Sequence, residues 1–423
     1  MNQFLYDIAT TLAAPPAKAW LALSPRHRPL LARFSPPSTP LAASPIWVHA
    51  CSVGELGVAK PVLMGLRGRD ADCPLLLTVS TRSAWEMASG MELPATLAWF
   101  PVDQRGVVRR FFDHVDPSML VLMETEIWPN VLHEAQRRNV PAIVLNGRIS
   151  DKHMQRYAKL PRFFKQVFGR ITAAGVQHSV YADRFQQLGL DATRVRITGN
   201  IKFDNVITAI DRDILQSLRA TCGLETASPI IVFGSTRPGD EALAAECWNN
   251  WRQSFPSATL IVAPRHANRL SEAIAPFDEP ILLRSQIVAG KAYANERILV
   301  IDTLGELTAF YALATVAIVG GSFYPGVNGH NPLEPAALGV PTVFGPYMRN
   351  FLDPAEALLQ ADAAIQVHTP GDLCAAVTSL LNDAPRRASL ASAAARAIEA
   401  NQGALAKSLD LLQAHMLIGN RHA

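Results

Sequence analysis

Charged residues and cysteines are both scarce in this sequence. Only 18% of the 423 residues are charged and the formal net charge is +3, so the strongly basic composition of a nucleic-acid-binding protein is absent. The five cysteines are scattered and form no close pair of the kind that zinc and redox sites use; they are Cys51, Cys73, Cys222, Cys247 and Cys374. We therefore expect no nucleic-acid partner and a reducing compartment.

Long apolar runs and metal-binding motifs are also missing. No run approaches the roughly 20 apolar residues that are needed to span a bilayer. The Asp-x-Asp triplets at 70–72 and 211–213 do not follow a predicted strand in the manner of a metal-dependent enzyme, and the Gly-x-Ser-x-Gly motif of hydrolases is absent. Cys51 has only His49 as a basic neighbour, which disfavours a cysteine nucleophile. We expect neither a metal site nor a cofactor.

The abundant feature is hydrophobic sequence, which makes up 49% of the chain and is enough to build the cores of two domains. From Ile46 onward, short apolar or β-branched runs alternate with longer amphipathic stretches, the pattern of βαβ units. One series of predicted strands ends near Gly199 and a second begins at Ile230. We predict an α/β protein of two doubly wound, Rossmann-like domains that face a cleft, with ligands at the carboxyl ends of the strands.

The predicted boundaries follow from these two series. Residues 1–45 form a Pro-rich N-terminal segment, 46–205 the first domain, 206–227 a linker, and 228–423 the second domain with its C-terminal helices. The N-terminal segment mixes apolar and aromatic residues with basic ones. It is interpreted either as an amphipathic segment on an anionic membrane surface or as a helix docked on the protein itself.

A glycine-rich loop in the second half is suited to an anionic ligand. A strand at 314–319 leads into Gly320 and Gly321, and Asn331-Pro332 is typical of a helix start. Backbone N–H groups at such a start can face a phosphate. The alternative is that Asn331 and Glu334 only form an Asn-x-x-Glu capping box.

Polar side chains follow strands of the first half as well. Glu55 comes after the strand at 46–50, and Glu124 follows the strand at 119–123 within Met-Glu-Thr-Glu. Each carboxylate could accept a proton from a substrate hydroxyl or could only stabilise a helix start. Arg148 follows the strand at 143–146 and is able to bind a carboxylate or phosphate, although a surface arginine is the plainer interpretation.

Three strand ends of the second half carry groups that suit an anion. Ser235 and Thr236 follow one strand and precede a helix, Arg265 and His266 end the next strand, and the glycine-rich loop follows a third. Because carboxyl ends of parallel strands meet at one edge of a sheet, these groups are expected around one point. Their combination is a stronger signal than any of the motifs alone.

Together, the motifs resemble one family, the 3-deoxy-D-manno-octulosonic acid (Kdo) transferases of lipopolysaccharide biosynthesis. The resemblance extends from Trp47 to about Phe351. It rests on Trp-Val-His-Ala-Cys-Ser-Val-Gly-Glu at 47–55, Glu-Thr-Glu-Ile-Trp-Pro-Asn at 124–130, Thr-Gly-Asn-Ile-Lys-Phe-Asp at 198–204, Ser-Thr-Arg-Pro-Gly at 235–239, Pro-Arg-His at 264–266, His-Asn-Pro-Leu-Glu-Pro-Ala at 330–336 and Gly-Pro-Tyr-Met-Arg-Asn-Phe at 345–351.

The resemblance implies an enzyme, a GT-B glycosyltransferase that is inverting and metal-independent and needs no cofactor. It would transfer Kdo from CMP-Kdo to a hydroxyl of the lipid A precursor (lipid IVA). The reaction would take place at the cytoplasmic face of the bacterial inner membrane, with the protein held there peripherally or by its N-terminus. Residues 46–205 would bind the acceptor and residues 228–423 the nucleotide sugar.

The resemblance also implies roles for single residues. Glu55 matches the catalytic glutamate of the family and would deprotonate the acceptor hydroxyl, with Glu124 as a supporting candidate. Arg148 would contact the acceptor or a carboxylate, and Lys202 would meet the carboxylate of the donor. The remaining donor-binding residues would be Ser235, Thr236, Arg265, Gly321, Asn331 and Glu334.

The sequence departs from the family pattern in three places. The N-terminal segment is short and broken by Pro15 and Pro16, which puts a membrane-spanning anchor in doubt. The loop before His330 is lengthened, and the stretch at 78–84 replaces a threonine-rich one. The alternatives are another GT-B glycosyltransferase, a sugar-nucleotide epimerase, or a non-catalytic protein that binds a membrane surface.

Overall fold

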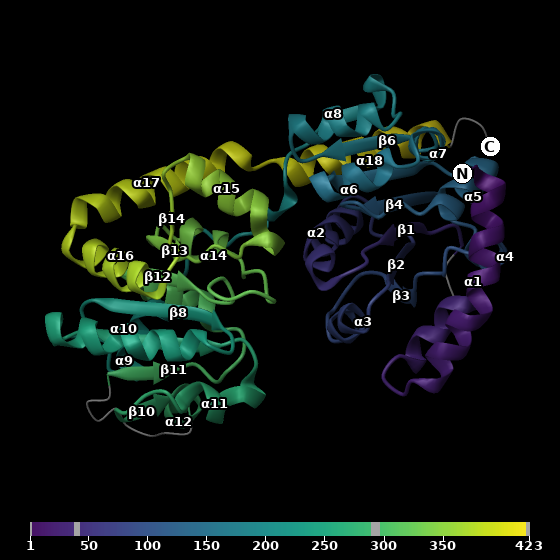
Figure 1. Ribbon diagram of the computed structural model, residues 1–423. Coiled ribbons are helices and arrows are strands. Elements are labelled where there is room, and N and C mark those ends of the chain that lie inside the picture. Colours follow the sequence, from purple (N-terminus) through teal and green to yellow (C-terminus); the bar gives the residue numbers. More distant parts are fainter. Residues whose placement is uncertain (1, 38–42, 289–296, 420–423) are drawn as a thin grey trace. The chain divides into compact units, whose positions relative to one another are not determined.

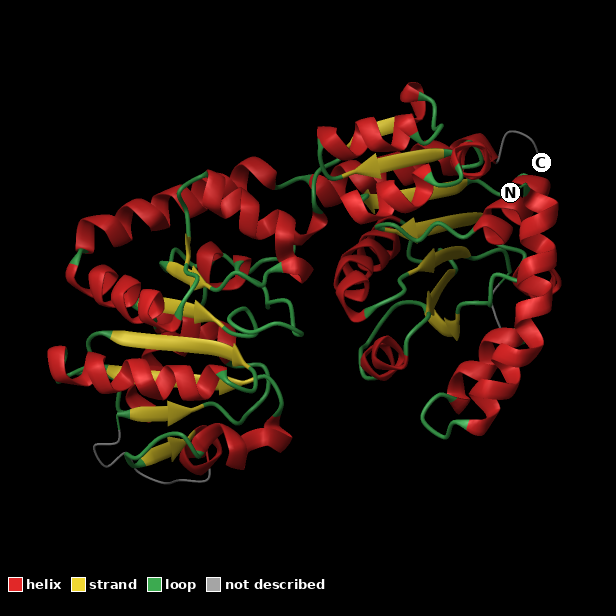
Figure 2. Ribbon diagram, viewed as in Figure 1, coloured by secondary structure: helices red, strands yellow, loops and turns green. Residues whose placement is uncertain are grey.

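The computed structural model describes residues 2–37, 43–288 and 297–419, which fold into two compact units (Figure 1). The first unit comprises the residues up to Asn205 and those from Asn401 onward, and the second comprises Val206–Ala400. Each unit holds a sheet of parallel strands with helices packed on its faces (Figure 2). The doubly wound α/β organisation predicted from the alternating pattern is confirmed for each half.

The sheet of the first unit has the order β3-β2-β1-β4-β5-β6-β7. Its strands are β1 Ile46–His49, β2 Leu75–Val79, β3 Thr96–Trp99, β4 Met119–Met123, β5 Ala142–Gly147, β6 Ala173–Val176 and β7 Val195–Ile197. Ile46 of β1 pairs with Leu75 of β2 on one side and with Met119 of β4 on the other. The strand order reverses between β1 and β4, and such a switch point is where doubly wound sheets open a crevice for ligands.

The helices of the first unit cover both faces of this sheet. They are α1 Gln3–Leu23, η1 Arg28–Phe34, α2 Val53–Arg69, α3 Arg82–Ser89, α4 Arg105–Val115, α5 Pro129–Arg137, α6 Asp151–Ala158, α7 Pro161–Phe168, α8 Ser179–Gln187, η2 Ala192–Arg194, η3 Ile201–Phe203 and α18 Ala404–Gly419. Successive strand residues point to opposite faces, so Trp47 packs with α4, α5 and α7 while Val48 packs with α2 and α18.

The second unit repeats the arrangement with the order β10-β11-β9-β8-β12-β13-β14. Its strands are β8 Ile230–Thr236, β9 Thr259–Pro264, β10 Ile281–Leu283, β11 Ile298–Val300, β12 Val316–Val319, β13 Thr342–Phe344 and β14 Ile365–Gln366. Its helices are α9 Arg212–Thr221, α10 Asp240–Ser254, η4 Ala267–Arg269, α11 Leu270–Ile274, α12 Arg284–Val288, α13 Leu307–Leu313, α14 Leu333–Ala337, η5 Arg349–Phe351, α15 Leu352–Gln360, α16 Pro370–Asn382 and α17 Ala384–Asn401. The switch point lies between β8 and β12.

The C-terminal helix corrects the predicted domain boundary. Residues from Asn401 onward were expected in the second domain, but α18 packs in the core of the first unit. The Asp204 carboxylate accepts hydrogen bonds from the backbone N–H groups of Gly403 and Leu405, both at 2.6 Å, and so caps the start of α18. The predicted linker at 206–227 belongs to the second unit, because Leu218 and Leu224 are buried in its core.

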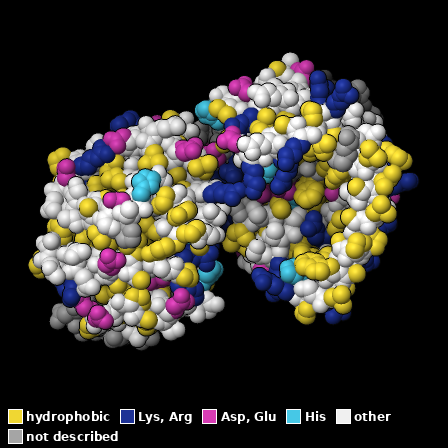
Figure 3. Space-filling view, viewed as in Figure 1, with side chains coloured by type: hydrophobic (Ala, Val, Ile, Leu, Met, Phe, Trp, Pro, Cys, Tyr) yellow, Lys and Arg dark blue, Asp and Glu magenta, His cyan; other side chains and the backbone are white. Residues whose placement is uncertain are grey.

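Helix α1 has one polar face docked on the first unit and one apolar face in solvent. Tyr6 donates a hydrogen bond to Asp103 at 2.8 Å, and Arg105 pairs with Asp7 at 3.2 Å. Large apolar side chains on the same helix are exposed, and Figure 3 shows them as a band along it; they are Phe4, Leu5, Ile8, Leu12, Trp20 and Leu23. Within the described residues, no helix combines the length and the apolar character that crossing a membrane requires.

A disulfide joins Cys247 of α10 to Cys374 of α16 within the second unit. The two cysteines are 127 residues apart, so their spacing gave no sign of the bond. Disulfides are uncommon in reducing compartments, and the bond therefore removes the argument for such a compartment that the scattered cysteines supplied. Cys51, Cys73 and Cys222 are free thiols.

Candidate functional site

The first unit gathers carboxylates at the carboxyl ends of β1 and β4, beside the switch point. Glu55 stands in the first turn of α2, which begins directly after β1, and Glu124 and Glu126 lie in the turn after β4. Glu124 has a φ of 54°, an uncommon value for a residue with a side chain. A backbone held in this conformation marks the turn as one whose geometry is fixed by its surroundings.

Glu55 accepts hydrogen bonds at the start of α2 and also lies near the acidic residues Glu124 and Glu126. Ser52 caps α2, and the Glu55 carboxylate accepts hydrogen bonds from the Cys51 N–H at 2.7 Å and from the Ser52 hydroxyl at 3.1 Å. Burial raises the pKa of Glu55 well above its usual range, and the charges of Glu126 and Glu124 add to the rise. The hydrogen bonds agree with a helix-start acid, the raised pKa makes the Glu55 carboxylate more basic, and its role as the base stays a prediction.

Glu126, which sequence reasoning left out of the site, completes this cluster. Its carboxylate lies 3.5 Å from His49 Nε2 and accepts a hydrogen bond from the Trp128 indole at 2.9 Å. Burial acts to raise the pKa of Glu126, but its contacts with His49 and Trp128 outweigh burial and lower the pKa. The Glu-x-Glu spacing after a strand was the available signal, since residues two apart in a turn can both face one site.

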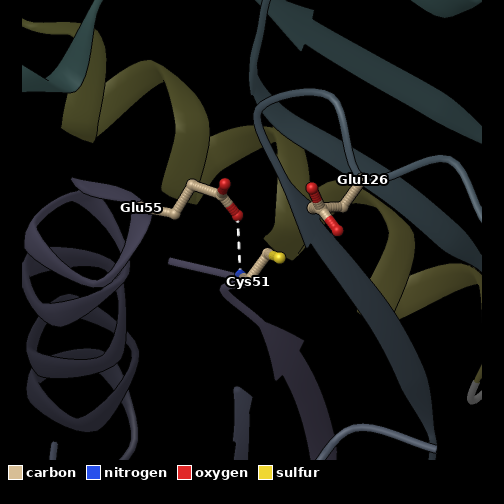
Figure 4. Close-up of side chains that lie close together, drawn as sticks. All are labelled: Cys51, Glu55 and Glu126. Carbon is tan, nitrogen blue, oxygen red and sulfur yellow. Dashed lines mark hydrogen bonds between the residues drawn. The ribbon is translucent and has the colours of Figure 1, made fainter. Parts of the chain in front are cut away.

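The thiol of Cys51 lies between the two carboxylates (Figure 4). One ligand atom from each of Cys51, Glu55 and Glu126 falls within 4.8 Å of the others, the one potential metal-ligand group of this kind among the described residues. Burial and the two carboxylates raise the pKa of the Cys51 thiol to about 12. A thiol that stays protonated is a poor nucleophile, which agrees with the sequence prediction.

Two cations meet Glu124 on the other side of the turn. Arg148, in the loop after β5, lies 3.4 Å from Glu124 Oε2, and Lys202 of η3 lies 3.6 Å from Oε1. Thr125 donates a hydrogen bond to the Arg148 carbonyl and ties the two loops together. The structure thus places Lys202, expected with the donor-binding residues, in the first unit beside Glu124.

The second unit forms its candidate site from the ends of β8, β9 and β12. Ser235, with a φ of 55°, and Thr236 end β8. The Thr236 hydroxyl is fully buried and donates to Glu241 at 2.8 Å, so it is used within the fold. Gly320 has no room for a Cβ atom, which would lie 2.6 Å from the Ser235 carbonyl oxygen.

The Asp240 carboxylate accepts hydrogen bonds from backbone N–H groups at the candidate site of the second unit. Its Oδ2 atom accepts hydrogen bonds from Gly321 N–H at 2.6 Å and from Arg237 N–H at 2.9 Å. Burial raises the pKa of Asp240 to about 7. The Gly321 N–H is therefore already bonded to an internal carboxylate, and the donor-binding role of Gly321 stays a prediction.

The helix at Asn331 also differs from the prediction. Helix α14 begins at Leu333, and Asn331 Oδ1 accepts the Leu333 N–H at 3.1 Å while its amide donates to Glu334 at 3.3 Å. The Asn-x-x-Glu capping box is therefore not formed, because Pro332 is the N-cap residue and makes no side-chain capping hydrogen bond. Burial raises the pKa of Glu334.

Cationic groups nevertheless surround this point. Burial lowers the pKa of His330 to about 4, and the charges of Arg265, Arg237 and His266 contribute to the decrease. Arg265 is exposed, whereas Arg237 Nε is buried without a hydrogen-bond partner. Arg237 and Arg265 therefore bring positive charge to these strand ends.

Comparisons with known proteins agree with the motifs. The sequence model of the family described as 3-deoxy-D-manno-octulosonic-acid transferase (kdotransferase) matches residues 26–205. A 3-deoxy-D-manno-octulosonic acid transferase of Bordetella pertussis is 33% identical over 88% of this chain and 88% of its own. A 3-deoxy-D-manno-octulosonic acid transferase of Haemophilus influenzae is 28% identical over 98% of this chain and 99% of its own.

Solved structures support the fold. An Anabaena protein crystallised with UDP has a TM-score of 0.56 at 13% identity and covers 88% of this chain and 99% of its own. The structure of a putative UDP-N-acetylglucosamine 2-epimerase from Listeria monocytogenes has a TM-score of 0.55 at 14% identity and covers 89% of this chain and 97% of its own. The GT-B class is confirmed by these likenesses and the two doubly wound sheets. With its relatives matched over most of its length, the chain belongs to the family of 3-deoxy-D-manno-octulosonic acid transferases and is a glycosyltransferase.

Proposed function

We propose that this enzyme transfers Kdo from CMP-Kdo to a hydroxyl of the lipid A precursor, lipid IVA, with inversion and without a metal ion. Family membership supports the donor and the acceptor. The observation that carries the mechanism is the Glu55 carboxylate at the carboxyl end of β1, held by two hydrogen bonds and made more basic by burial and by the neighbouring acids.

Glu55 acts as the general base. The acceptor oxygen attacks the anomeric carbon of Kdo while the bond from that carbon to the CMP phosphate breaks, and the hydroxyl proton moves to the Glu55 carboxylate. A base whose pKa lies closer to the working pH is matched to this task. Glu124 is held by ion pairs with Arg148 and Lys202 and contributes a negative charge near the reacting centre. Either of the two cations can bind a carboxylate of the substrates.

The second unit binds the donor. Arg265 and Arg237 interact with the phosphate of CMP-Kdo and stabilise the charge that develops as CMP leaves. Ser235, Thr236, Gly321, Asn331 and Glu334 shape the site around it. Since Thr236 and Gly321 already bond to internal carboxylates, their contribution is to hold the loops in place.

The exposed apolar side chains of α1 bind a membrane surface. Tyr6 and Asp7 fix one face of the helix to the first unit, so the opposite face is free to insert aromatic and aliphatic groups at the lipid headgroups. We place the enzyme peripherally at the cytoplasmic face of the bacterial inner membrane, where lipid IVA and CMP-Kdo meet.

The test incubates the enzyme with lipid IVA and CMP-Kdo generated in situ, adds a chelator after donor synthesis, and measures the mass of the lipid. The wild type is expected to add Kdo in the presence of chelator, and Glu55→Gln is expected to lose about 10²- to 10⁴-fold in rate. Glu86→Gln, at an exposed glutamate paired with Arg82, is the matched control. Full activity of Glu55→Gln would remove it as the base, and loss of activity with chelator would contradict metal independence.

A further inference from the structure

The acidic cluster of the first unit contains a combination of atoms that general-base chemistry does not need. Cys51 contributes a sulfur atom within 4.8 Å of carboxylate oxygens from Glu55 and Glu126 (Figure 4). A thiolate with two carboxylates is a ligand set for a thiophilic divalent ion such as Zn²⁺ or Cd²⁺. Base catalysis explains Glu55, but it gives no role to the thiol.

His49 provides a second, independent observation. The imidazole is fully buried, and its Nδ1 lies 3.0 Å from the Thr78 carbonyl oxygen, which can only accept a hydrogen bond. In the neutral ring Nδ1 therefore carries the proton, and the lone pair is on Nε2. That atom has no hydrogen-bond partner and faces Glu126 Oε2 at 3.5 Å.

Two electron-pair donors that face each other in this way need a positive centre between them. A proton supplies one, and a metal ion supplies another. Ligand atoms on neighbouring corners of a tetrahedral zinc site are about 3.3 Å apart, given zinc bond lengths of about 2.0–2.1 Å. The separation of 3.5 Å between His49 Nε2 and Glu126 Oε2 is close to that spacing, and His49 stands beside Glu126 but outside the group whose ligand atoms all lie within 4.8 Å of one another.

We propose that Cys51, Glu55 and Glu126 bind Zn²⁺ or a similar thiophilic divalent ion, with His49 next to Glu126 outside the ligand group, and that the bound ion inhibits the enzyme. The inhibition rests on the proposed function, since an ion that binds Glu55 occupies the electron pair that would accept the proton from the acceptor. The site is thus inhibitory and is compatible with metal-independent catalysis.

The surroundings set the strength of binding. The guanidinium of Arg33 donates hydrogen bonds to the carbonyl groups of Phe100 and Ser80 and opposes a further positive charge nearby. The thiol must release its proton when a metal ion binds. We therefore expect a reversible site that a strong chelator empties.

The first measurement is binding, which requires no turnover. Chelator-treated full-length wild type, Cys51→Ala and Cys73→Ala compete for Zn²⁺ with a chromogenic chelator, and Cd²⁺ is added to detect the ultraviolet absorption of a metal–thiolate bond. Cys73 is also a free thiol of the first unit but lies outside the cluster, which makes it the matched control. Thermal unfolding verifies that each variant is folded.

Wild type and Cys73→Ala are expected to bind one ion with the thiolate absorption. Loss of a group that only orients a ligand typically costs about 10- to 100-fold in affinity, so loss of the thiolate should weaken binding by at least about tenfold. Zn²⁺ should inhibit wild-type transfer, and inhibition of Cys51→Ala, relative to its own metal-free rate, should need at least about tenfold more Zn²⁺.

Equal Zn²⁺ affinity of wild type and Cys51→Ala, or absence of the thiolate absorption from the wild type, would overturn the proposed site. Binding without any effect on transfer would overturn the inhibition. Failure of Glu55 as the base is recognised separately, because Glu55→Gln would then remain active in the chelator-treated assay whatever the binding measurement gives.

Discussion

Asp240 is a buried carboxyl group whose ionisation should oppose folding of the second unit. It is fully inaccessible to solvent, Oδ2 accepts two backbone hydrogen bonds, and Oδ1 has none. Burial raises its pKa from 3.8 to about 7. A group with a raised folded-state pKa contributes stability that is complete below the unfolded-state pKa and is lost as the pH rises through the folded-state value.

The magnitude follows from these two pKa values. Ionisation of Asp240 should cost the folded unit up to about 4 kcal/mol, of which about 2–3 kcal/mol is lost between about pH 5 and about pH 8. Asp240→Asn keeps an oxygen acceptor for Gly321 and Arg237 but does not ionise. The free energy of unfolding of the variant, relative to wild type, should therefore rise by about 2–3 kcal/mol across this pH range.

Hydrogen exchange of β8 and α10 in wild type and variant at the two pH values measures this difference locally. Asp372→Asn serves as the control without a pH-dependent difference, because a hydrogen bond from Thr369 lowers the pKa of this exposed helix-start acid and keeps it ionised at both pH values. A difference between wild type and Asp240→Asn that does not change with pH would refute the reasoning. It would mean that water or a rearranged partner compensates the buried charge.

Two further predictions concern packing and the docking of α1. Gly320→Ala should destabilise the second unit by about 1–3 kcal/mol or more, because the added methyl group would lie under 3 Å from backbone atoms of Ser235 and Thr236. Gly57→Ala adds a methyl group in open space on α2 and should stabilise the first unit by about 0.5–1 kcal/mol. Urea unfolding measures both, and equal effects would contradict the packing argument. Tyr6→Phe removes a hydrogen bond to Asp103 and should cost about 1.5–3 kcal/mol at about pH 8. Burial raises the pKa of Asp103 to about 6, so Asp103 is protonated at about pH 4 and the loss of unfolding free energy in Tyr6→Phe should be smaller there. Urea unfolding measures this loss, and a loss that does not change with pH would contradict a hydrogen bond to an ionised Asp103.

The two interpretations of Glu55 turned out to be compatible. A carboxylate that caps a helix is expected to be stabilised as an anion, which lowers its basicity. Here burial and two further acids more than offset the hydrogen bonds from Cys51 and Ser52. The helix start therefore orients the carboxylate while its neighbours make it basic, and only the second effect depends on residues far away in the sequence.

The alternation of apolar runs and amphipathic stretches determined the two parallel sheets, because strands buried on both faces and helices with one apolar face leave distinct periodic patterns. Order along the chain also placed Glu55, Glu124 and Arg265 at strand ends. Contacts between distant segments were decided by the tertiary structure alone. The return of α18 to the first unit depends on Asp204 and on buried leucines 200 residues later, and the bond between Cys247 and Cys374 depends on two helices that only packing brings together. The meeting of His49, Glu126 and Cys51, and the capture of the Gly321 N–H by Asp240, likewise follow from strand order and burial, which local sequence does not encode.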